Sequence, residues 1–123
     1  MSEVHIKVEP VPGTTLAESK DQARTLRTEQ VLPALEQGQH VVLDFTDVGF
    51  ATQSFVHALI SEAIRRYREG VFDVMEFKGC SPEVQQTVLT VFEYTLAASD
   101  AADELQAADE WPDGPPIEAA TEA

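Results

Sequence analysis

Residues 41–64, VVLDFTDVGFATQSFVHALISEAI, decide the fold of this chain because they join a strand, a polar loop and a helix. Residues 41–45 form a short apolar run rich in β-branched and aromatic side chains, typical of a strand buried on both faces. After the loop the chain has the apolar spacing of one helical face, with Phe55, Val56, Leu59, Ile60, Ala63, Ile64 and Tyr67. This helix is expected to end at Gly70, a residue suited to the left-handed position that follows a helix. The loop itself, residues 46–53, lies where α/β sheets usually place their binding groups.

The flanking segments predict an alternation of strands and helices. Residues 4–8 alternate apolar and polar side chains, which predicts an edge strand. Residues 15–35 predict a polar helix that Pro33 ends or kinks, residues 71–77 a further strand, and residues 82–96 a helix with a broad apolar face. We therefore expect a single α/β domain with a small, mostly parallel or mixed sheet of about four strands, covered by three or more helices.

The segment LDFTDVGFATQSF resembles the strand, loop and helix start of STAS domains, the fold of bacterial anti-sigma-factor antagonists. It is more similar still to a STAS-like family of small prokaryotic proteins, and the resemblance extends over most of residues 15–96. In this alignment Thr52 falls on the antagonists' loop aspartate, and Gln53 falls on the serine that their kinase phosphorylates. Ser54 falls on their second serine, whereas Phe55 replaces a glycine. The usual phosphate acceptor is thus absent.

The resemblance implies a non-catalytic protein-interaction module of a prokaryotic regulatory, partner-switching-like system. The implied partner is an ATP-binding protein of the histidine-kinase-like type, bound through residues 48–54 and the exposed face of the following helix. The contacts expected on this surface are Thr52, Gln53, Ser54, His57, Ser61, Arg65 and Arg68. Ser54 has two interpretations. In the first, it caps the helix, a role that Thr52 could also have. In the second, either Ser54 or Thr52 accepts phosphate in place of the missing serine.

Asp44 ends the strand before the loop, and we expect its carboxylate to accept hydrogen bonds from loop amides and so to fix the loop's shape. The alternative is a small receiver-like or hydrolytic enzyme that uses Asp44, Asp47 and Ser54. No nucleophile motif surrounds Ser54 or Cys80, and no phosphate-binding loop is present. The histidines His5, His40 and His57 have no metal-ligand spacing, so we expect neither a metal nor a cofactor, and no enzyme.

Negative charge dominates the composition, since 22 acidic and 8 basic side chains give the 123-residue chain a net charge of −14. Residues 97–123 carry eight of the acidic groups and no basic one, which predicts an acidic, Pro-containing and partly disordered tail after a domain of residues 1–96. The lone Trp111 in this tail is either a partner anchor or a residue that folds back on the domain. Such charge disfavours nucleic acid and anionic membranes as partners, and it also suits an acidic subunit of a larger phage or defence assembly.

The single cysteine, Cys80, excludes an internal disulfide and favours a reducing cytoplasm. We expect Cys80 to be a small buried filler, and the alternative is a thiol acidified by its position just before a predicted helix start. The opening residues lack the basic flank and apolar run of a signal peptide, and no apolar stretch approaches the roughly 20 residues that span a bilayer. We expect a cytoplasmic protein.

Overall fold

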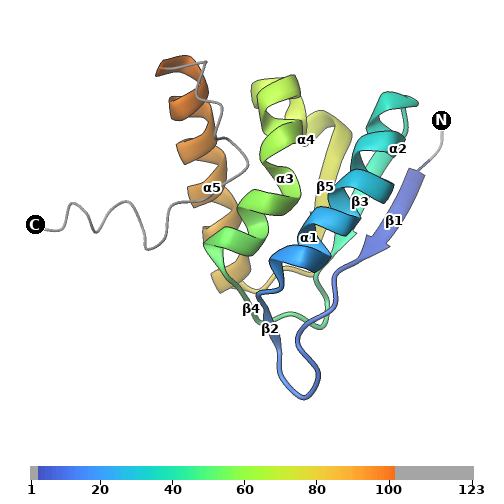
Figure 1. Ribbon diagram of the computed structural model, residues 1–123, viewed down its shortest axis with the longest axis vertical. Coiled ribbons are helices and arrows are strands. Elements are labelled where there is room, and N and C mark those ends of the chain that lie inside the picture. Colours follow the sequence, from blue (N-terminus) through green and yellow to red (C-terminus); the bar gives the residue numbers. More distant parts are fainter. Residues whose placement is uncertain (1–2, 102–123) are drawn as a thin grey trace, which may run out of the picture.

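The computed structural model describes residues 3–101, so residues 102–123, which hold most of the predicted acidic tail and Trp111, lie outside the described residues. Residues 97–101 belong to the helix that begins at Pro82, which therefore runs past its predicted end at residue 96. Three strands, β1 (Glu3–Lys7), β3 (His40–Asp44) and β5 (Met75–Lys78), form a parallel sheet in the order β1-β3-β5 (Figure 1). The predicted central strand is therefore in the middle, and the prediction that the first strand lies at an edge is confirmed.

The helices α1 (Lys20–Leu26), α3 (Gln53–Tyr67) and α5 (Pro82–Ala101) lie together on one face of this sheet, with α3 between the other two (Figure 1). Alternate strand residues point toward them and enter the main core, among them Ile6, Val41, Leu43 and Met75. The prediction of an α/β domain with parallel strands and crossover helices is thus confirmed, and residues 3–101 form two layers.

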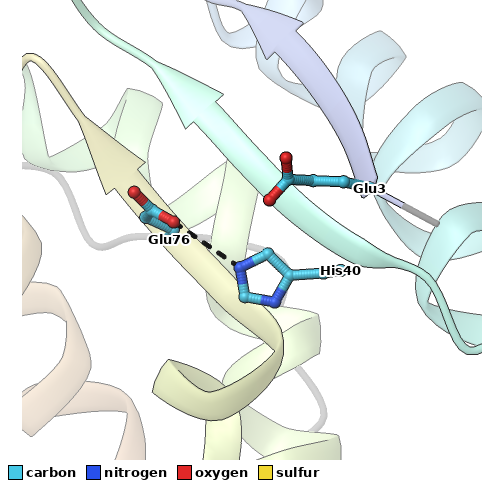
Figure 2. A group of neighbouring side chains, drawn as sticks. All are labelled: Glu3, His40 and Glu76. Carbon is cyan, nitrogen blue, oxygen red and sulfur yellow. Dashed lines mark ion pairs between the residues drawn. The ribbon is translucent and has the colours of Figure 1, made fainter. Parts of the chain in front are cut away.

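The other face of the sheet carries polar side chains in register across the strands. Between β1 and β3, Glu3 lies beside His40, His5 beside Val42 and Lys7 beside Asp44. Between β3 and β5, Val42 lies beside Glu76 and Asp44 beside Lys78. Figure 2 shows Glu3, His40 and Glu76 projecting from this face. Val42 is only 2% exposed there although it is not part of the main core, because the neighbouring long side chains can cover it. The central strand is therefore buried on both faces, as expected, but helices cover only one of them.

The expected helix over residues 15–35 is shorter and more irregular than predicted. Leu16–Ala17 form a short strand, β2, and the helix begins at Lys20 after Ser19, whose side chain accepts a hydrogen bond from the backbone N–H of Gln22 at 3.1 Å. The chain then widens into a π-helical turn, Arg27–Val31, and continues as α2 (Leu32–Glu36). Pro33 explains this distortion, since it lacks the N–H that an α-helical ladder needs.

The predicted strand over residues 71–77 was placed too early. Val71–Val74 form one helical turn, α4, and strand β5 begins only at Met75. Before it, α3 ends where Arg68 has a positive φ of 55°, followed by a 3-10 turn, Arg68–Gly70. The prediction that Gly70 supplies the left-handed residue is therefore wrong, because its φ is −72°. Val71 and Met75 are both buried, and this packing overrides the strand preference of the valine.

Candidate functional site

The segment from Thr46 to Thr52 connects β3 to α3 at the carboxyl end of the sheet. The carboxylate of Asp44 accepts hydrogen bonds from the backbone N–H of Thr46 at 2.9 Å and from the Thr46 hydroxyl. These bonds, assisted by the charges of Lys78 and Lys7, hold the pKa of the Asp44 carboxyl below its usual value. Asp44 therefore shapes the loop as expected. Asp47, in the same loop, forms an ion pair with Lys7 at 2.6 Å.

Backbone pairing holds the far side of this loop in place. Phe50–Ala51 form the short strand β4, which pairs in parallel with β2. Residues 3–101 thus hold five short strands in two sheets, where the sequence predicted one sheet of about four. The N–H of Gly49 donates to the carbonyl of Thr15 at 2.8 Å. The hydroxyl of Ser81, at the start of α5, donates to the carbonyl of Gly49 at 2.8 Å. Segments from three parts of the chain thus fix the loop conformation.

The first turn of α3 is capped by Thr52. Its side-chain oxygen accepts a hydrogen bond from the backbone N–H of Phe55 at 3.1 Å, and its φ and ψ are extended. The interpretation of Ser54 as the cap is therefore wrong, because Ser54 lies within the first helical turn. Thr52, Gln53 and Ser54 are all half-buried, so each of the three predicted contact residues presents part of its side chain to solvent.

Phe50 is the most exposed large apolar side chain in the described part of the chain, with 55% of its surface accessible. Val48 and Ala51 on either side of it are buried and anchor the loop. Phe50 was not among the predicted contact residues, since the alternation of buried and exposed residues in this loop follows from the short β2–β4 pairing. A sequence pattern that predicted a strand at residues 50–51, with Ala51 facing the core, would have placed Phe50 on the solvent side of that strand.

His57 and Ser61 do not lie on an exposed face of α3, and that prediction is wrong. They are 3% and 0% exposed, and the ring of His57 packs against Tyr94 of α5 with centroids 6.2 Å apart. The physical reason is that α3 lies between α1 and α5, which cover both of its flanks (Figure 1). The spacing of apolar residues along α3 therefore underestimates how much of the helix is buried. These two residues are not available to a partner on the surface.

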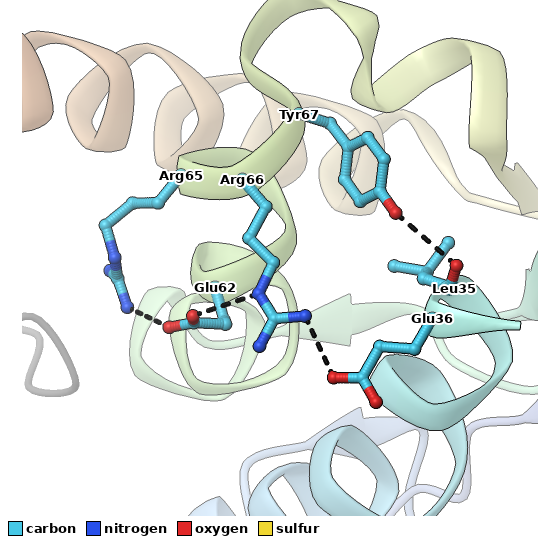
Figure 3. A network of polar contacts seen from close by, with 6 residues as sticks. All are labelled: Leu35, Glu36, Glu62, Arg65, Arg66 and Tyr67. Carbon is cyan, nitrogen blue, oxygen red and sulfur yellow. Dashed lines mark hydrogen bonds and ion pairs between the residues drawn. The ribbon is translucent and has the colours of Figure 1, made fainter. Parts of the chain in front are cut away.

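The solvent side of α3 carries an ion-pair network, shown in Figure 3. The carboxylate of Glu62 accepts hydrogen bonds from Arg65 at 2.6 Å and from Arg66 at 3.2 Å, and Arg66 also donates to Glu36 of α2 at 3.1 Å. Burial alone would raise the pKa of Glu62, but the two arginines outweigh it and the pKa lies below its usual value. The predicted contact residue Arg65 is thus at the surface, with its guanidinium already paired.

Cys80 follows β5 and is half-buried. Burial, and then the carboxylate of Asp44, raise the pKa of its thiol, which contradicts the alternative of an acidified thiol. Cys80 lines an open groove of about 400 Å³ between β5 and α5, together with Phe77, Gly79, Gln85, Val88 and Leu89. The role of partly buried filler fits these surroundings.

The strand, loop and helix of the candidate site lie within a match to a known protein family. Residues 22–85 match the family described as "STAS-like domain of unknown function (DUF4325)", a match of 64 of the 123 residues. The chain belongs to this STAS-like family. The match runs from α1 through β5 to the first turn of α5 and so includes the whole candidate site of this STAS-like domain. Neither curated proteins nor solved structures gave a match.

Within residues 3–101 no helix combines the length and the hydrophobicity that crossing a bilayer requires.

Proposed function

We propose that this STAS-like domain is a non-catalytic protein-interaction module of a prokaryotic regulatory system, which binds its partner through residues 48–54. The observation that carries the proposal is Phe50, a large aromatic side chain exposed on a loop whose backbone is fixed. An exposed aromatic side chain on a preorganised loop is a common anchor of protein interfaces, since little conformational entropy is lost when it is buried.

Polar side chains that follow Phe50 in the chain support the same proposed binding surface. Gln53 and Ser54 follow it at the start of α3, and both are partly exposed. An apolar anchor surrounded by hydrogen-bonding groups is the usual composition of a protein interface. Arg65 lies further along α3 and belongs to the same proposed surface, although it must exchange or share its ion pair with Glu62 on binding.

The absence of catalysis is part of the proposal. Ser54 would need a general base, and the nearest candidate along the helix, His57, is buried against Tyr94 on the α5 side. Asp44 is occupied with the Thr46 amide and hydroxyl, and Asp47 with Lys7. The raised pKa of Cys80 disfavours a thiolate nucleophile. These contacts support an interaction role over a receiver-like or hydrolytic one.

The proposed partner is an ATP-binding protein of the histidine-kinase-like type, by the resemblance to anti-sigma-factor antagonists. Thr52 is the less suitable of the two candidate phosphate acceptors, because its hydroxyl caps α3 and a phosphate would disrupt that bond. Ser54 lies in the first turn of a 15-residue helix, where the helix dipole favours a negative group. Phosphate on Ser54 would place a charge beside the Phe50 loop and so weaken binding.

Affinity capture from the native cell extract tests this proposal, with the wild-type chain, Gln53→Glu and Gln86→Glu compared with and without ATP and magnesium. Gln86 is an exposed residue of α5, so Gln86→Glu adds the same charge away from the loop. The expected result is an ATP-binding protein retained by the wild type and by Gln86→Glu and lost with Gln53→Glu. Equal recovery of the ATP-binding protein with all three chains would show that residues 48–54 are not part of the interface.

A further inference from the structure

Glu3, His40 and Glu76 come together at the opposite end of the molecule from the Phe50 loop. They belong to the three neighbouring strands β1, β3 and β5, and one ligand atom from each lies within 4.8 Å of the other two. Figure 2 shows all three side chains on the polar face of the sheet, with His40 Nε2 3.7 Å from a carboxylate oxygen of Glu76. The three residues thus present one nitrogen and two carboxylate donors to a common point.

The parallel register accounts for this arrangement. Glu3 and His40 are direct partners at the amino ends of β1 and β3, and Glu76 is the β5 partner of Val42, two residues beyond His40 on the same face. Because the backbone positions are fixed by sheet hydrogen bonds, only side-chain rotations are needed to draw the three ligand atoms together.

The charges of the cluster favour a cation. Within residues 3–101, neither Glu3 nor Glu76 forms an ion pair with a lysine or an arginine, so two nearby carboxylates share only histidine partners. One of these is His5, whose Nε2 lies 3.0 Å from Glu3 Oε1. A divalent ion would remove the repulsion between the carboxylates, and the net charge of −14 raises the local concentration of cations.

The mixture of ligands determines the class of metal. Calcium and magnesium are bound almost entirely by oxygen atoms, whereas imidazole together with carboxylates suits zinc and its neighbours in the first transition row. The side chains of Glu3 and Glu76 are exposed and that of His40 is half-buried, which leaves one side of the cluster open to water ligands.

We propose that Glu3, His40 and Glu76 bind one divalent transition-metal ion, for which Zn²⁺ is the probe, with water completing the coordination. His5 is a positioning residue that holds the carboxylate of Glu3. The bound ion would link all three strands of the main sheet and so stabilise the folded chain. Because the cluster lies at the amino ends of the strands and residues 48–54 follow the carboxyl end of β3, this site does not depend on the proposed partner surface.

Equilibrium dialysis of the full chain with Zn²⁺ tests the site, with His40→Gln, Glu76→Gln and Glu69→Gln as variants. Glu69 is an exposed carboxylate in the turn after α3, so Glu69→Gln removes one negative charge without touching the cluster. We expect one Zn²⁺ per chain in the wild type and in Glu69→Gln. His40→Gln and Glu76→Gln should weaken binding by at least about tenfold, since even residues that only hold a ligand in place cost that much when replaced.

Circular dichroism shows whether the variants fold, and all three replaced residues are partly or fully exposed. A rise of the unfolding temperature with Zn²⁺ in the wild type, absent in His40→Gln, is the second expected readout. No saturable binding, or Zn²⁺ binding that is the same in His40→Gln as in the wild type, would overturn the proposal, because the ion would then be held by scattered carboxylates.

Discussion

The side-chain oxygen of Thr52 accepts a hydrogen bond from the backbone N–H of Phe55 at 3.1 Å, which makes Thr52 and not Ser54 the cap of α3. This bond sets the direction in which the chain leaves the Phe50 loop. The capping role therefore belongs to Thr52, and Ser54 is not needed for it.

Thr52→Ala is expected to lower the free energy of unfolding by about 1 kcal/mol, the usual cost of losing a helix cap. Ser54→Ala serves as the control and should change the free energy of unfolding by less than about 0.5 kcal/mol, since Ser54 forms no cap and is partly exposed. Urea unfolding of both variants measures the difference. A larger loss in Ser54→Ala than in Thr52→Ala would contradict the assignment of the cap.

Gly79 is predicted to tolerate no side chain, because it packs directly on the loop after β3. Its φ is +70°, and a Cβ atom there would approach Thr46 Oγ1 to 2.6 Å and Thr46 Cα to 3.0 Å. Gly79→Ala should lower the free energy of unfolding by more than the roughly 1 to 2 kcal/mol of a left-handed alanine alone.

Gly38→Ala is the matched control for Gly79→Ala in the same unfolding experiment. Gly38 has a φ of +78° with nothing within 4 Å of a Cβ, so its replacement costs only the backbone strain. Equal losses in the two variants would show that the contact between Gly79 and Thr46 is unimportant.

Arg68 ends α3 with a φ of 55° and a ψ of −134°, a conformation that suits glycine. Its side chain also makes an interaction in the folded chain, so Arg68→Gly must be compared with Arg68→Ala, which loses the same side chain and keeps the strain. Arg68→Gly should be more stable than Arg68→Ala by about 1 kcal/mol, because the strain relieved exceeds the backbone entropy lost. Thermal unfolding of the two variants measures this difference in stability. If Arg68→Gly were less stable than Arg68→Ala, the prediction would be wrong.

The network around Glu62 predicts a pH-dependent part of the stability. Its folded-state pKa is lowered from 4.5, so the contribution is fully present above about pH 4.5 and is lost as the pH falls through the lower folded-state value. At pH 7, Glu62→Gln should cost about 0.5 to 1 kcal/mol, discounted because solvent screens these side chains.

Urea unfolding of Glu62→Gln and the wild type at several pH values measures this contribution. The difference between the two should shrink as the solution is acidified below pH 4.5. Glu69→Gln is the control, an exposed carboxylate without an ion pair among the described residues. A difference that stays constant down to acidic pH would show that Arg65 and Arg66 are not the cause.

Much of the fold could be predicted from the stretch 41–64 and its flanks. The apolar run of β3, the periodicity of α3 and the strand–helix alternation require parallel strands with helical crossovers, and the structure has them. Asp44 was also correctly placed, since a carboxylate at a strand end has loop amides within reach.

The wrong predictions concern residues whose exposure or neighbours are determined by tertiary contacts. His57 and Ser61 are polar residues on α3, yet α5 packs against that flank. No local pattern reveals a neighbour such as Tyr94, which is distant from His57 in the chain. The short β2–β4 pairing is too brief for a strand signal, so the exposure of Phe50 was missed. The Glu3, His40 and Glu76 cluster depends on register between strands, which residue spacing does not encode.

Photo-crosslinking in the native cell tests the central claim, the binding of a protein partner at residues 48–54, most directly. A photoreactive phenylalanine analogue at position 50 keeps the aromatic side chain, and the same analogue at position 89 probes Leu89, which is 47% exposed in α5 beside the groove. We predict a crosslink from position 50 to one ATP-binding protein and none to that protein from position 89. No crosslink from position 50, or the same products from both positions, would contradict the assignment of the Phe50 loop as the partner surface.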